Sequence, residues 1–183
     1  TDPDLWDWTA DRLEEIGRLE PGTIDELVAR NVAVKSSIVT ADERETARDG
    51  PGRAALNLGH TFAHAIETVG RLSPTNNPSD APLLHGEAVM LGLVAATSAA
   101  EALGRIESGA TEDVRRTVER TGLATRIEGL PTNGELIERM RHDKKALSGR
   151  LRLVVPIPGR RVEMLEVEDP GVLAQGWDAI RGC

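Results

Sequence analysis

The spacing of apolar and polar positions predicts a chain made mostly of helices. Apolar residues recur every three or four positions in several stretches, and glycine, proline or a capping side chain bounds each stretch. The predicted helices cover approximately residues 2–17, 23–45, 53–70, 83–104, 111–121, 132–142 and 169–180. Trp6 is expected on the apolar side of the first helix. Capping boxes are expected at Thr23 with Glu26 and at Thr132 with Glu135, and Asp169 is expected to cap the last helix. Two short apolar runs flank Pro158 and Gly159 within residues 151–167, which predicts a β-hairpin. We therefore expect one mostly α, bundle-like domain over residues 1–183, with about seven helices and one small β-hairpin near the C-terminus.

The stretch 83–104 is predicted to be the central helix. After Glu87 it contains almost only small and apolar residues, and a helix that is apolar on all sides lies in a core. Gly92 and the alanines that follow it leave room for neighbouring helices to approach closely. His85 stands at the N-terminus of this helix, after a loop over residues 73–82 that contains three prolines and two asparagines.

The stretch from Arg53 to Glu67 is predicted to be one continuous helix with a polar stripe. At about 100° per residue, five of its polar side chains fall within an arc of about 80°. These side chains are Arg53, Asn57, His60, His64 and Glu67. Apolar residues such as Phe62 and Ile66 cover the other sides, and buried polar groups need partners. The stripe is therefore either a satisfied internal network or the wall of a functional site.

Two histidines of this stripe, His60 and His64, lie one helical turn apart, and His85 is a candidate to join them. Neighbouring imidazoles can share a metal ion, or one can bind metal while another moves a proton. The alternative is a pair of structural histidines, because two ligands alone do not make a metal site. A zinc peptidase is disfavoured, because the sequence lacks the glutamate of the HExxH motif. Glu67 or Glu87 can act as a ligand, as a base or as a residue that orients a ligand, and spacing does not choose among these roles.

Four cationic side chains accompany these residues. Lys35 lies in the second predicted helix, Arg53 in the polar stripe, and Lys144 and Lys145 in a predicted basic loop over residues 141–149. Clustered on a chain with a formal net charge of −8, they can form a local site for a carboxylate or a phosphate. The alternative is that each cation is a solvated surface charge. The apolar neighbours of Lys35 weaken this alternative for Lys35 more than for the adjacent lysines.

The composition narrows the classes of partner. The chain has 30 acidic and 22 basic residues, which argues against nucleic acid. No run approaches the roughly 20 apolar residues of a membrane span, and no signal peptide is visible. The single cysteine, Cys183, permits no internal disulfide, which favours a reducing compartment. We expect a cytoplasmic protein that binds neither nucleic acid nor membrane.

Four segments of the chain resemble the C-terminal helical domain of 3-dehydroquinate synthase, in the order found in that family. The segments are VKSSIVTADERE (Val34–Glu45), RAALNLGHTFAHAIE (Arg53–Glu67), HGEAVMLGLV (His85–Val94) and DKKALSGRLRLVVP (Asp143–Pro156). Four motifs in order are much more specific than a GHTxxH pattern alone. The loops over residues 46–52 and 73–82 are longer than the usual loops of the family.

The resemblance implies a role in binding metal and substrate. It implies that His60 and His85 are two of the three protein ligands of a catalytic Zn²⁺ or Co²⁺. It also implies that a sugar phosphate is bound by Lys35, Arg53, Asn57, His64 and one of Lys144 and Lys145, the first four being catalytic. The implied lyase reaction converts 3-deoxy-arabino-heptulosonate 7-phosphate to 3-dehydroquinate and phosphate, in the shikimate pathway of aromatic amino acid biosynthesis. NAD⁺ transiently oxidises a ring hydroxyl in this reaction, which acidifies the neighbouring C–H bond.

The same resemblance implies that the complete enzyme has a second domain. In the family, an N-terminal NAD-binding domain and the third zinc ligand, a glutamate, precede the segment that corresponds to this chain. Residues 1–183 contain no G-x-G-x-x-G motif and no βαβ pattern, and they begin with Thr1, as a processed or trimmed chain does. We therefore expect this chain alone to be inactive, to bind zinc weakly and to expose a face that the NAD-binding domain covers. We expect the complete enzyme to be a homodimer.

Two alternatives stay open at this point. Related sugar-phosphate cyclases make 2-deoxy-scyllo-inosose or valiolone-type rings, although the DKK segment and His64 favour the dehydroquinate synthase reaction. Dehydrogenases of the glycerol dehydrogenase type are more distant, because they lack the full Arg-Asn-His-His string. The alternative from a different class is a truncated, non-catalytic helical module that only folds and associates.

Overall fold

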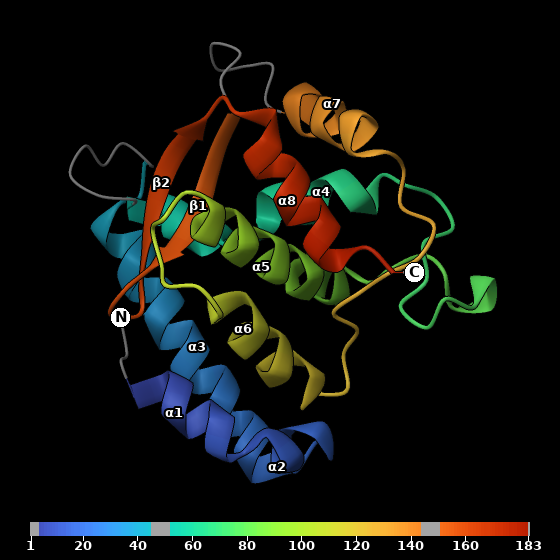
Figure 1. Cartoon of the computed structure of the whole chain (residues 1–183). Coiled ribbons are helices and arrows are strands. Elements are labelled where there is room, and N and C mark those ends of the chain that lie inside the picture. Colours follow the sequence, from blue (N-terminus) through green and yellow to red (C-terminus); the bar gives the residue numbers. More distant parts are fainter. Residues whose placement is uncertain (1–3, 45–51, 144–150, 183) are drawn as a thin grey trace.

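Helices make up most of the chain in the computed structural model, which describes residues 4–44, 52–143 and 151–182 (Figure 1). In chain order the elements are α1 (Asp4–Asp11), α2 (Leu13–Gly17), α3 (Pro21–Ala41), the 3₁₀ helix η1 (Gly52–Asn57), α4 (His60–Glu67), the 3₁₀ helix η2 (Pro78–Asp80), α5 (His85–Ala102), α6 (Ala110–Glu119), α7 (Asn133–Asp143), β1 (Leu151–Ile157), β2 (Arg161–Val167) and α8 (Pro170–Ile180). The predicted fold class, mostly α with one small β-hairpin near the C-terminus, is confirmed. Within these ranges, no helix has both the length and the apolarity that crossing a membrane requires.

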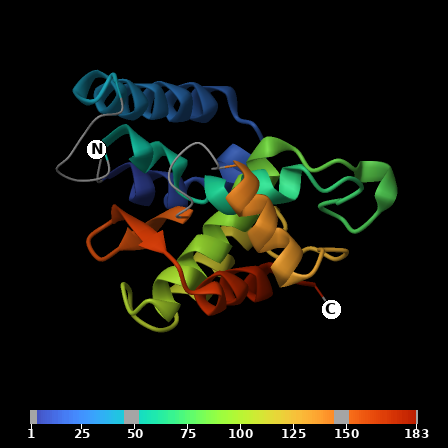
Figure 2. The same cartoon turned by 90° about the horizontal axis from the view of Figure 1, so that it is seen from above.

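Helix α5 is the centre of the domain, as its sequence predicted. Its side chains from Leu91 to Ala100 are mostly buried, and α4, α6, α8 and β1 all pack against it (Figure 2). Beside it, the two largest fully buried side chains, Phe62 of α4 and Trp177 of α8, meet edge to face with 4.8 Å between their ring centroids. Because aromatic residues are only 2% of the chain, the rest of the core consists of aliphatic side chains packed between helices.

Gly92 of α5 brings this helix into backbone contact with the start of α4. A Cβ atom at Gly92 would lie 2.2 Å from the carbonyl oxygen of Gly59, far inside van der Waals distance. Gly59 itself has φ of +77°, a left-handed conformation that favours glycine, and its own Cβ would lie 2.8 Å from the amide nitrogen of Leu93. Neither position tolerates a side chain, so the two glycines set how closely α4 and α5 approach.

The prediction of one continuous helix from Arg53 to Glu67 is wrong. Residues 52–57 form η1, the chain turns through Leu58 and Gly59, and only residues 60–67 form α4. The left-handed backbone at Gly59 ends the first segment, and the contact with α5 fixes the start of the second. The five polar side chains of the stripe therefore belong to two helical segments rather than to one.

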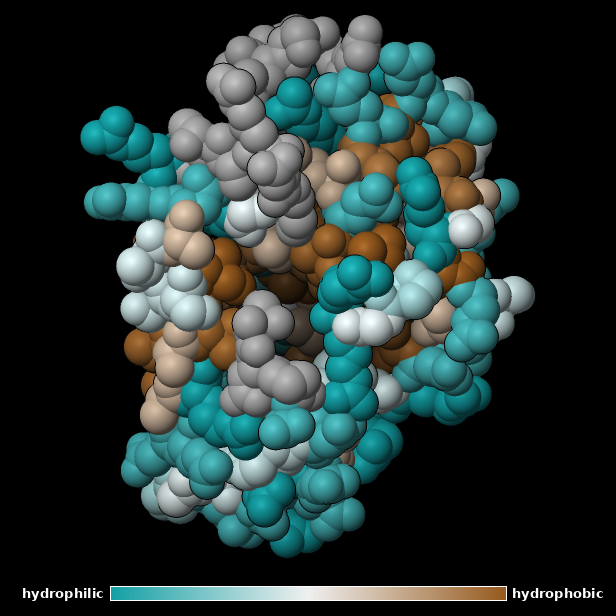
Figure 3. All heavy atoms as spheres, turned by 90° about the vertical axis from the view of Figure 1, so that its left-hand side faces the viewer, coloured by the Kyte–Doolittle hydropathy of each residue, from teal (hydrophilic) through white to brown (hydrophobic). Residues whose placement is uncertain are grey.

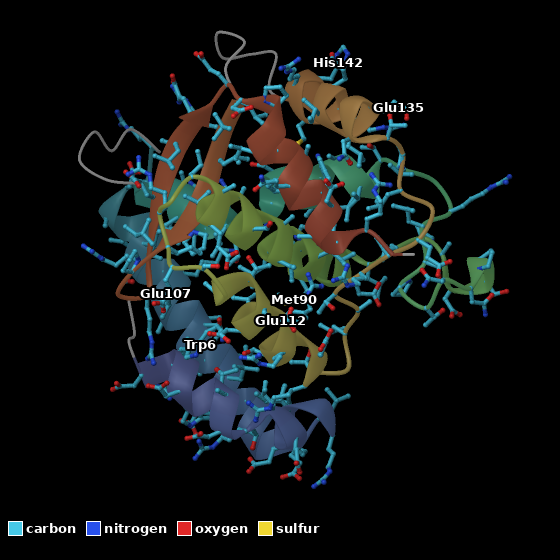
Figure 4. The ribbon with its side chains drawn as sticks, in the orientation of Figure 1. Trp6, Met90, Glu107, Glu112, Glu135 and His142 are labelled. Atoms are coloured by element: carbon cyan, nitrogen blue, oxygen red, sulfur yellow. The ribbon has the colours of Figure 1, made fainter. Side chains whose placement is uncertain are left out.

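Helices α1, α2 and α3 form an N-terminal layer that also departs from the prediction. The stretch 2–17 forms two helices, which break at Arg12. Trp6, expected on the apolar side, is 49% exposed, and Figure 4 labels it on this N-terminal layer. The guanidinium groups of Arg12 and Arg30 both lie over the ring of Trp8, at 4.8 and 5.3 Å from its centroid. Cation–π contacts of this kind contribute about 0.5–1 kcal/mol at an exposed site.

Helix α3 begins at Pro21 rather than at the predicted capping box of Thr23 and Glu26. The Thr23 hydroxyl instead donates to the Glu15 carboxylate of α2 at 2.6 Å, which joins the two helices. No residue of α3 is buried. Val28 and Val32, which share one face of α3, are 54% and 60% exposed. Figure 3 shows a hollow with hydrophobic walls on the side of the molecule where α3 and β2 lie in Figure 1.

The C-terminal elements agree with those predicted from the sequence. Strands β1 and β2 pair antiparallel in the register Leu151 to Val167, on either side of the Pro158–Gly159 turn. Arg160, in this turn, forms a two-point ion pair with Asp7 of α1 at 2.7 and 2.9 Å, and the hydrogen bond from Arg160 lowers the pKa of the Asp7 carboxyl. The predicted caps are also present at the start of α7 and of α8, formed by Thr132 with Glu135 and by Asp169.

We predict that Gly92→Ala destabilises the domain by about 1–3 kcal/mol or more, because the added methyl group overlaps the Gly59 carbonyl. Gly134→Ala in α7 is the control, because a Cβ there meets nothing within 4 Å. Alanine is the better helix former, so the control should be as stable as the parent or more stable by up to about 1 kcal/mol. Urea unfolding followed by circular dichroism measures both; equal midpoints for Gly92→Ala and the parent would contradict the close contact.

Candidate functional site

Three histidine rings lie together where α4 and α5 begin. His60 is the first residue of α4, His64 follows one turn later, and His85 is the first residue of α5. The ring centroids are 5.7 Å apart for His60 and His64, 5.4 Å for His60 and His85, and 6.4 Å for His64 and His85. The cluster follows from the packing of α4 on α5, which the contact between Gly59 and Gly92 controls. The structure thus brings together the three histidines that the sequence selected.

Two of these rings are oriented through their Nδ1 atoms. The Nδ1–H of His60 donates to the Leu58 carbonyl at 3.1 Å, since a carbonyl oxygen can only accept. Nδ1 of His85 lies 2.7 Å from Oε1 of Glu67, a carboxylate that likewise favours the proton on Nδ1. In the neutral form, each ring then has its lone pair on Nε2.

This arrangement fits a divalent metal ion such as zinc. Histidine ligands typically bind metal through one ring nitrogen and donate the other N–H to a carbonyl or a carboxylate, as His60 and His85 do here. In the part of the chain that the structure describes, no group of three or more His, Cys, Asp or Glu side chains is placed to hold a metal. The described residues therefore contain no complete metal site, and His60 and His85 could supply two of its ligands.

The structure separates the roles of the two glutamates that the sequence could not assign. Glu67, the last residue of α4, holds His85. Glu87 turns back to the start of its own helix, where its carboxylate accepts a hydrogen bond from the Leu84 amide at 2.7 Å. Glu87 therefore caps α5 and Glu67 orients a histidine.

A first hollow, about 260 Å³ in volume, lies beside His60. It is lined by Lys35, Arg53, Leu56, Asn57 and His60. Four of these are predicted site residues, and they meet here although α3, η1 and α4 are separate elements. Their meeting does not depend on the continuous helix that the sequence suggested.

Arg53 is held in this hollow by the end of α3. Its backbone amide donates to the Asp42 carboxylate at 3.0 Å, and its Nη1 donates to the Glu43 carbonyl at 3.2 Å. Asp42 is 9% exposed, and the sequence prediction did not select it. Asp42 lies within the family-like segment Val34–Glu45, but neither that resemblance nor the apolar pattern of α3 showed that the chain folds back onto its carboxylate.

A second hollow of similar volume, about 260 Å³, borders His64 of the cluster. It is lined by His64, Ala65, Thr68, Arg139 and His142. Of these residues, only His64 was predicted as a site residue. Arg139 and His142 are three residues apart on α7, and Figure 4 shows His142 near one end of this helix and Glu135 near the other. Helix α7 extends one residue beyond the predicted helix 132–142, to Asp143, so the first residues of the predicted loop are helical. Lys144 and Lys145 lie outside the described residues.

The side chains that line the two hollows place positive charges and hydrogen-bonding groups next to the histidine cluster, although the chain as a whole is acidic. Lys35 and Arg53 lie on the His60 side, and Arg139 lies on the His64 side. A ligand that combines an anionic group with several hydroxyls suits this set, because the cations attract the anion and the histidines and Asn57 can bind hydroxyls. The arrangement is suited to an oxygen-rich anion next to two imidazoles whose Nε2 atoms could bind a metal ion.

Comparison with known proteins adds a family and a fold. Residues 1–146 match the family described as 3-dehydroquinate synthase C-terminal. Among solved structures, the fold is similar to that of ValA, a 2-epi-5-epi-valiolone synthase from Streptomyces hygroscopicus subsp. jinggangensis determined with NAD⁺ and Zn²⁺ bound. The TM-score is 0.69 at 16% sequence identity, and the match covers 98% of this chain and 47% of that one. The chain therefore spans about half the length of that enzyme.

We predict that His60 and His85 both carry their proton on Nδ1 when neutral, and that Glu67→Gln shifts His85 toward the Nε2–H tautomer. The carboxamide holds the Nδ1 proton less strongly than the carboxylate does. Two-bond ¹⁵N–¹H correlation spectra at alkaline pH report the tautomer of each ring. His60, held by a backbone carbonyl, is the internal control and should not change. A His85 ring that is already in the Nε2–H form in the parent chain would show that the contact with Glu67 does not fix it.

Proposed function

This chain belongs to the 3-dehydroquinate synthase C-terminal family, and we propose from this that it is the metal- and substrate-binding half of a sugar-phosphate cyclase. The reaction we propose is that of 3-dehydroquinate synthase, in which 3-deoxy-arabino-heptulosonate 7-phosphate loses phosphate and closes to 3-dehydroquinate. The observation that carries this proposal is the histidine cluster, which borders two hollows lined in part by cationic side chains. A metal site and a sugar phosphate site would then share one wall.

His60 and His85 are the residues that would hold the metal, through Nε2 in each case. Their Nδ1 partners, the Leu58 carbonyl and Glu67, fix the ring orientation and the tautomer before any metal arrives. When bound, a metal ion and NAD⁺ supply polarisation of a substrate hydroxyl and transient oxidation of its carbon. A third protein ligand would come from the NAD-binding half.

The other site residues would bind and orient the substrate. The planar guanidinium of Arg53 suits a carboxylate. Its bond to the Glu43 carbonyl, together with the bond from the Arg53 backbone amide to Asp42, holds the residue at the end of α3 before substrate binds. Lys35 adds a mobile positive charge, and the Asn57 amide can both donate to and accept from hydroxyls. His64 can hold or move a proton close to the leaving phosphate.

Several features support a second half as the partner. Lys35 is exposed, α3 contributes no buried residue, and Val28 and Val32 remain uncovered in this chain. A covering domain would exclude water from the hollow, which strengthens every charge interaction with the substrate. We propose an NAD-binding domain in this role, and we propose that the complete enzyme acts in the cytoplasm as a homodimer.

A second candidate function within the same class is a valiolone-type cyclase, which the fold similarity to a 2-epi-5-epi-valiolone synthase favours. The two functions differ in substrate, since the dehydroquinate synthase substrate carries a carboxylate. Arg53 in the first hollow is the residue that would recognise this carboxylate.

The deciding experiment is an assay of phosphate release by this chain together with an NAD-binding half, in the presence of NAD⁺ and Zn²⁺. We expect turnover with 3-deoxy-arabino-heptulosonate 7-phosphate and little with sedoheptulose 7-phosphate or glucose 6-phosphate. The chain without the NAD-binding half should release no phosphate. Preferential turnover of sedoheptulose 7-phosphate would replace the proposed reaction by the valiolone-type one.

We predict that Lys35→Gln lowers kcat/KM by about 10- to 100-fold in this assay, because a charge-assisted hydrogen bond to the substrate is lost. Arg116→Gln is the matched control, since it also removes one positive charge but pairs with Asp113 within α6, away from the hollow. The control should keep the parent rate. Equal rates for Lys35→Gln and the control would remove Lys35 from the site.

A further inference from the structure

We propose that Arg139 of α7 is a positioning residue for the histidine cluster, because it binds the C-terminal end of α4 and so keeps Glu67 against His85. Its catalytic consequence rests on the proposed function, whereas its effect on Glu67 and His85 does not. Arg139 is absent from the residues that the family resemblance implies for the site.

The contact is specific and involves two acceptors. Nη1 of Arg139 donates to the hydroxyl of Thr68 at 3.0 Å and to the backbone carbonyl of Thr68 at 3.3 Å. The same hydroxyl donates onward to the Ala65 carbonyl at 3.0 Å. Carbonyls at the end of a helix lack helical partners and carry the negative end of the helix dipole. A guanidinium placed there satisfies both needs.

The position of Thr68 explains why this contact matters for the site. Thr68 directly follows Glu67, the last residue of α4, and Glu67 holds Nδ1 of His85 at 2.7 Å. Helix α4 has only eight residues, and helix ends open more readily than helix centres. Its first turn is fixed by the contact of Gly59 with α5, and Arg139 ties down its last turn.

Arg139 projects from a helix that is itself firmly anchored. Leu136, Ile137 and Met140 of α7 are all buried, with at most 6% exposure. Removing the Arg139 side chain should therefore leave α7 in place and release only the end of α4. Arg141, two residues further along, pairs instead with Glu138 of its own helix at 2.8 Å. It therefore offers a control with the same side chain in the same helix.

The first test uses the chain without metal. In Arg139→Gln we expect the amides of Thr68 and Val69 to exchange with deuterium about two- to five-fold faster, the loss typical of a cation at a helix C-terminus. We also expect the His85 ring to shift toward the Nε2–H tautomer, in the same direction as in Glu67→Gln. Arg139→Lys keeps a charged donor, so its amide exchange rates and its His85 tautomer should stay close to those of the parent chain. Arg141→Gln should change neither quantity.

The second test uses the chain together with its NAD-binding half and titrates Co²⁺ by its visible absorption. Glu67→Gln should weaken binding about 10- to 100-fold, as expected for the loss of a carboxylate behind a histidine ligand. Arg139→Gln should weaken it by a smaller factor of about two to five. The double variant should bind no more weakly than Glu67→Gln alone, because Arg139 acts through Glu67.

Two results would overturn the proposal. One is an Arg139→Gln variant that matches Arg141→Gln in amide exchange and in the His85 tautomer. The other is a loss of Co²⁺ affinity that adds fully to that of Glu67→Gln, which would mean that Arg139 acts by another route. If no variant binds Co²⁺ and the assay shows no cyclase activity, the proposed function fails. The exchange and tautomer measurements still decide the role of Arg139.

Discussion

The close contact between Gly59 and Gly92 is the constraint on which the rest of this structure depends. At this point two helices touch through their backbones, because neither residue has a side chain to hold them apart. His60 follows Gly59 directly, and His85 lies two helical turns before Gly92 on the same helix. The distance between two candidate metal ligands is therefore set by the packing of small residues rather than by a polar interaction.

Hydrogen-bond partners then determine which nitrogen of each histidine ring faces a ligand. The Leu58 carbonyl and Glu67 each engage one nitrogen of a histidine ring, so both rings present the other nitrogen to a ligand. Hydrogen bonds also position residues next to the histidines. Asp42 and Glu43 accept hydrogen bonds from Arg53, and Arg139 donates hydrogen bonds to the end of α4. The rings and cations that face the ligand are thus supported by carboxylates, carbonyls and a second guanidinium. This arrangement keeps the site ordered before a ligand binds.

The domain has a well-packed core around α5, whereas α3 at its edge is largely exposed to solvent. Helix α5, with Phe62 and Trp177 beside it, provides a continuous aliphatic and aromatic core. Helix α3 contributes Lys35 to the first hollow, yet it buries no residue and exposes two valines. A helix with such a surface gains from a further partner, and this agrees with a chain that spans about half the length of a similar enzyme.

The sequence by itself determined the elements whose pattern is local. The all-apolar stretch that became α5, the hairpin around Pro158 and Gly159, and the caps of α7 and α8 follow from spacing and turn chemistry. The choice of His60, His64 and His85 also came from the sequence, since histidines in an apolar setting stand out. These features could be predicted because each depends on residues close together in the chain.

Only the tertiary structure decided how the site is assembled. The break at Gly59 escaped prediction because helical periodicity continues through it, and the glycine on α5 that requires it is 33 positions away. The different roles of Glu67 and Glu87 depend on which histidine or amide lies within reach. The contact of Arg139 with the end of α4 likewise joins helices that are distant in sequence. Spacing along a chain fixes the direction of a side chain within its own element, but its partners are fixed by how the elements pack.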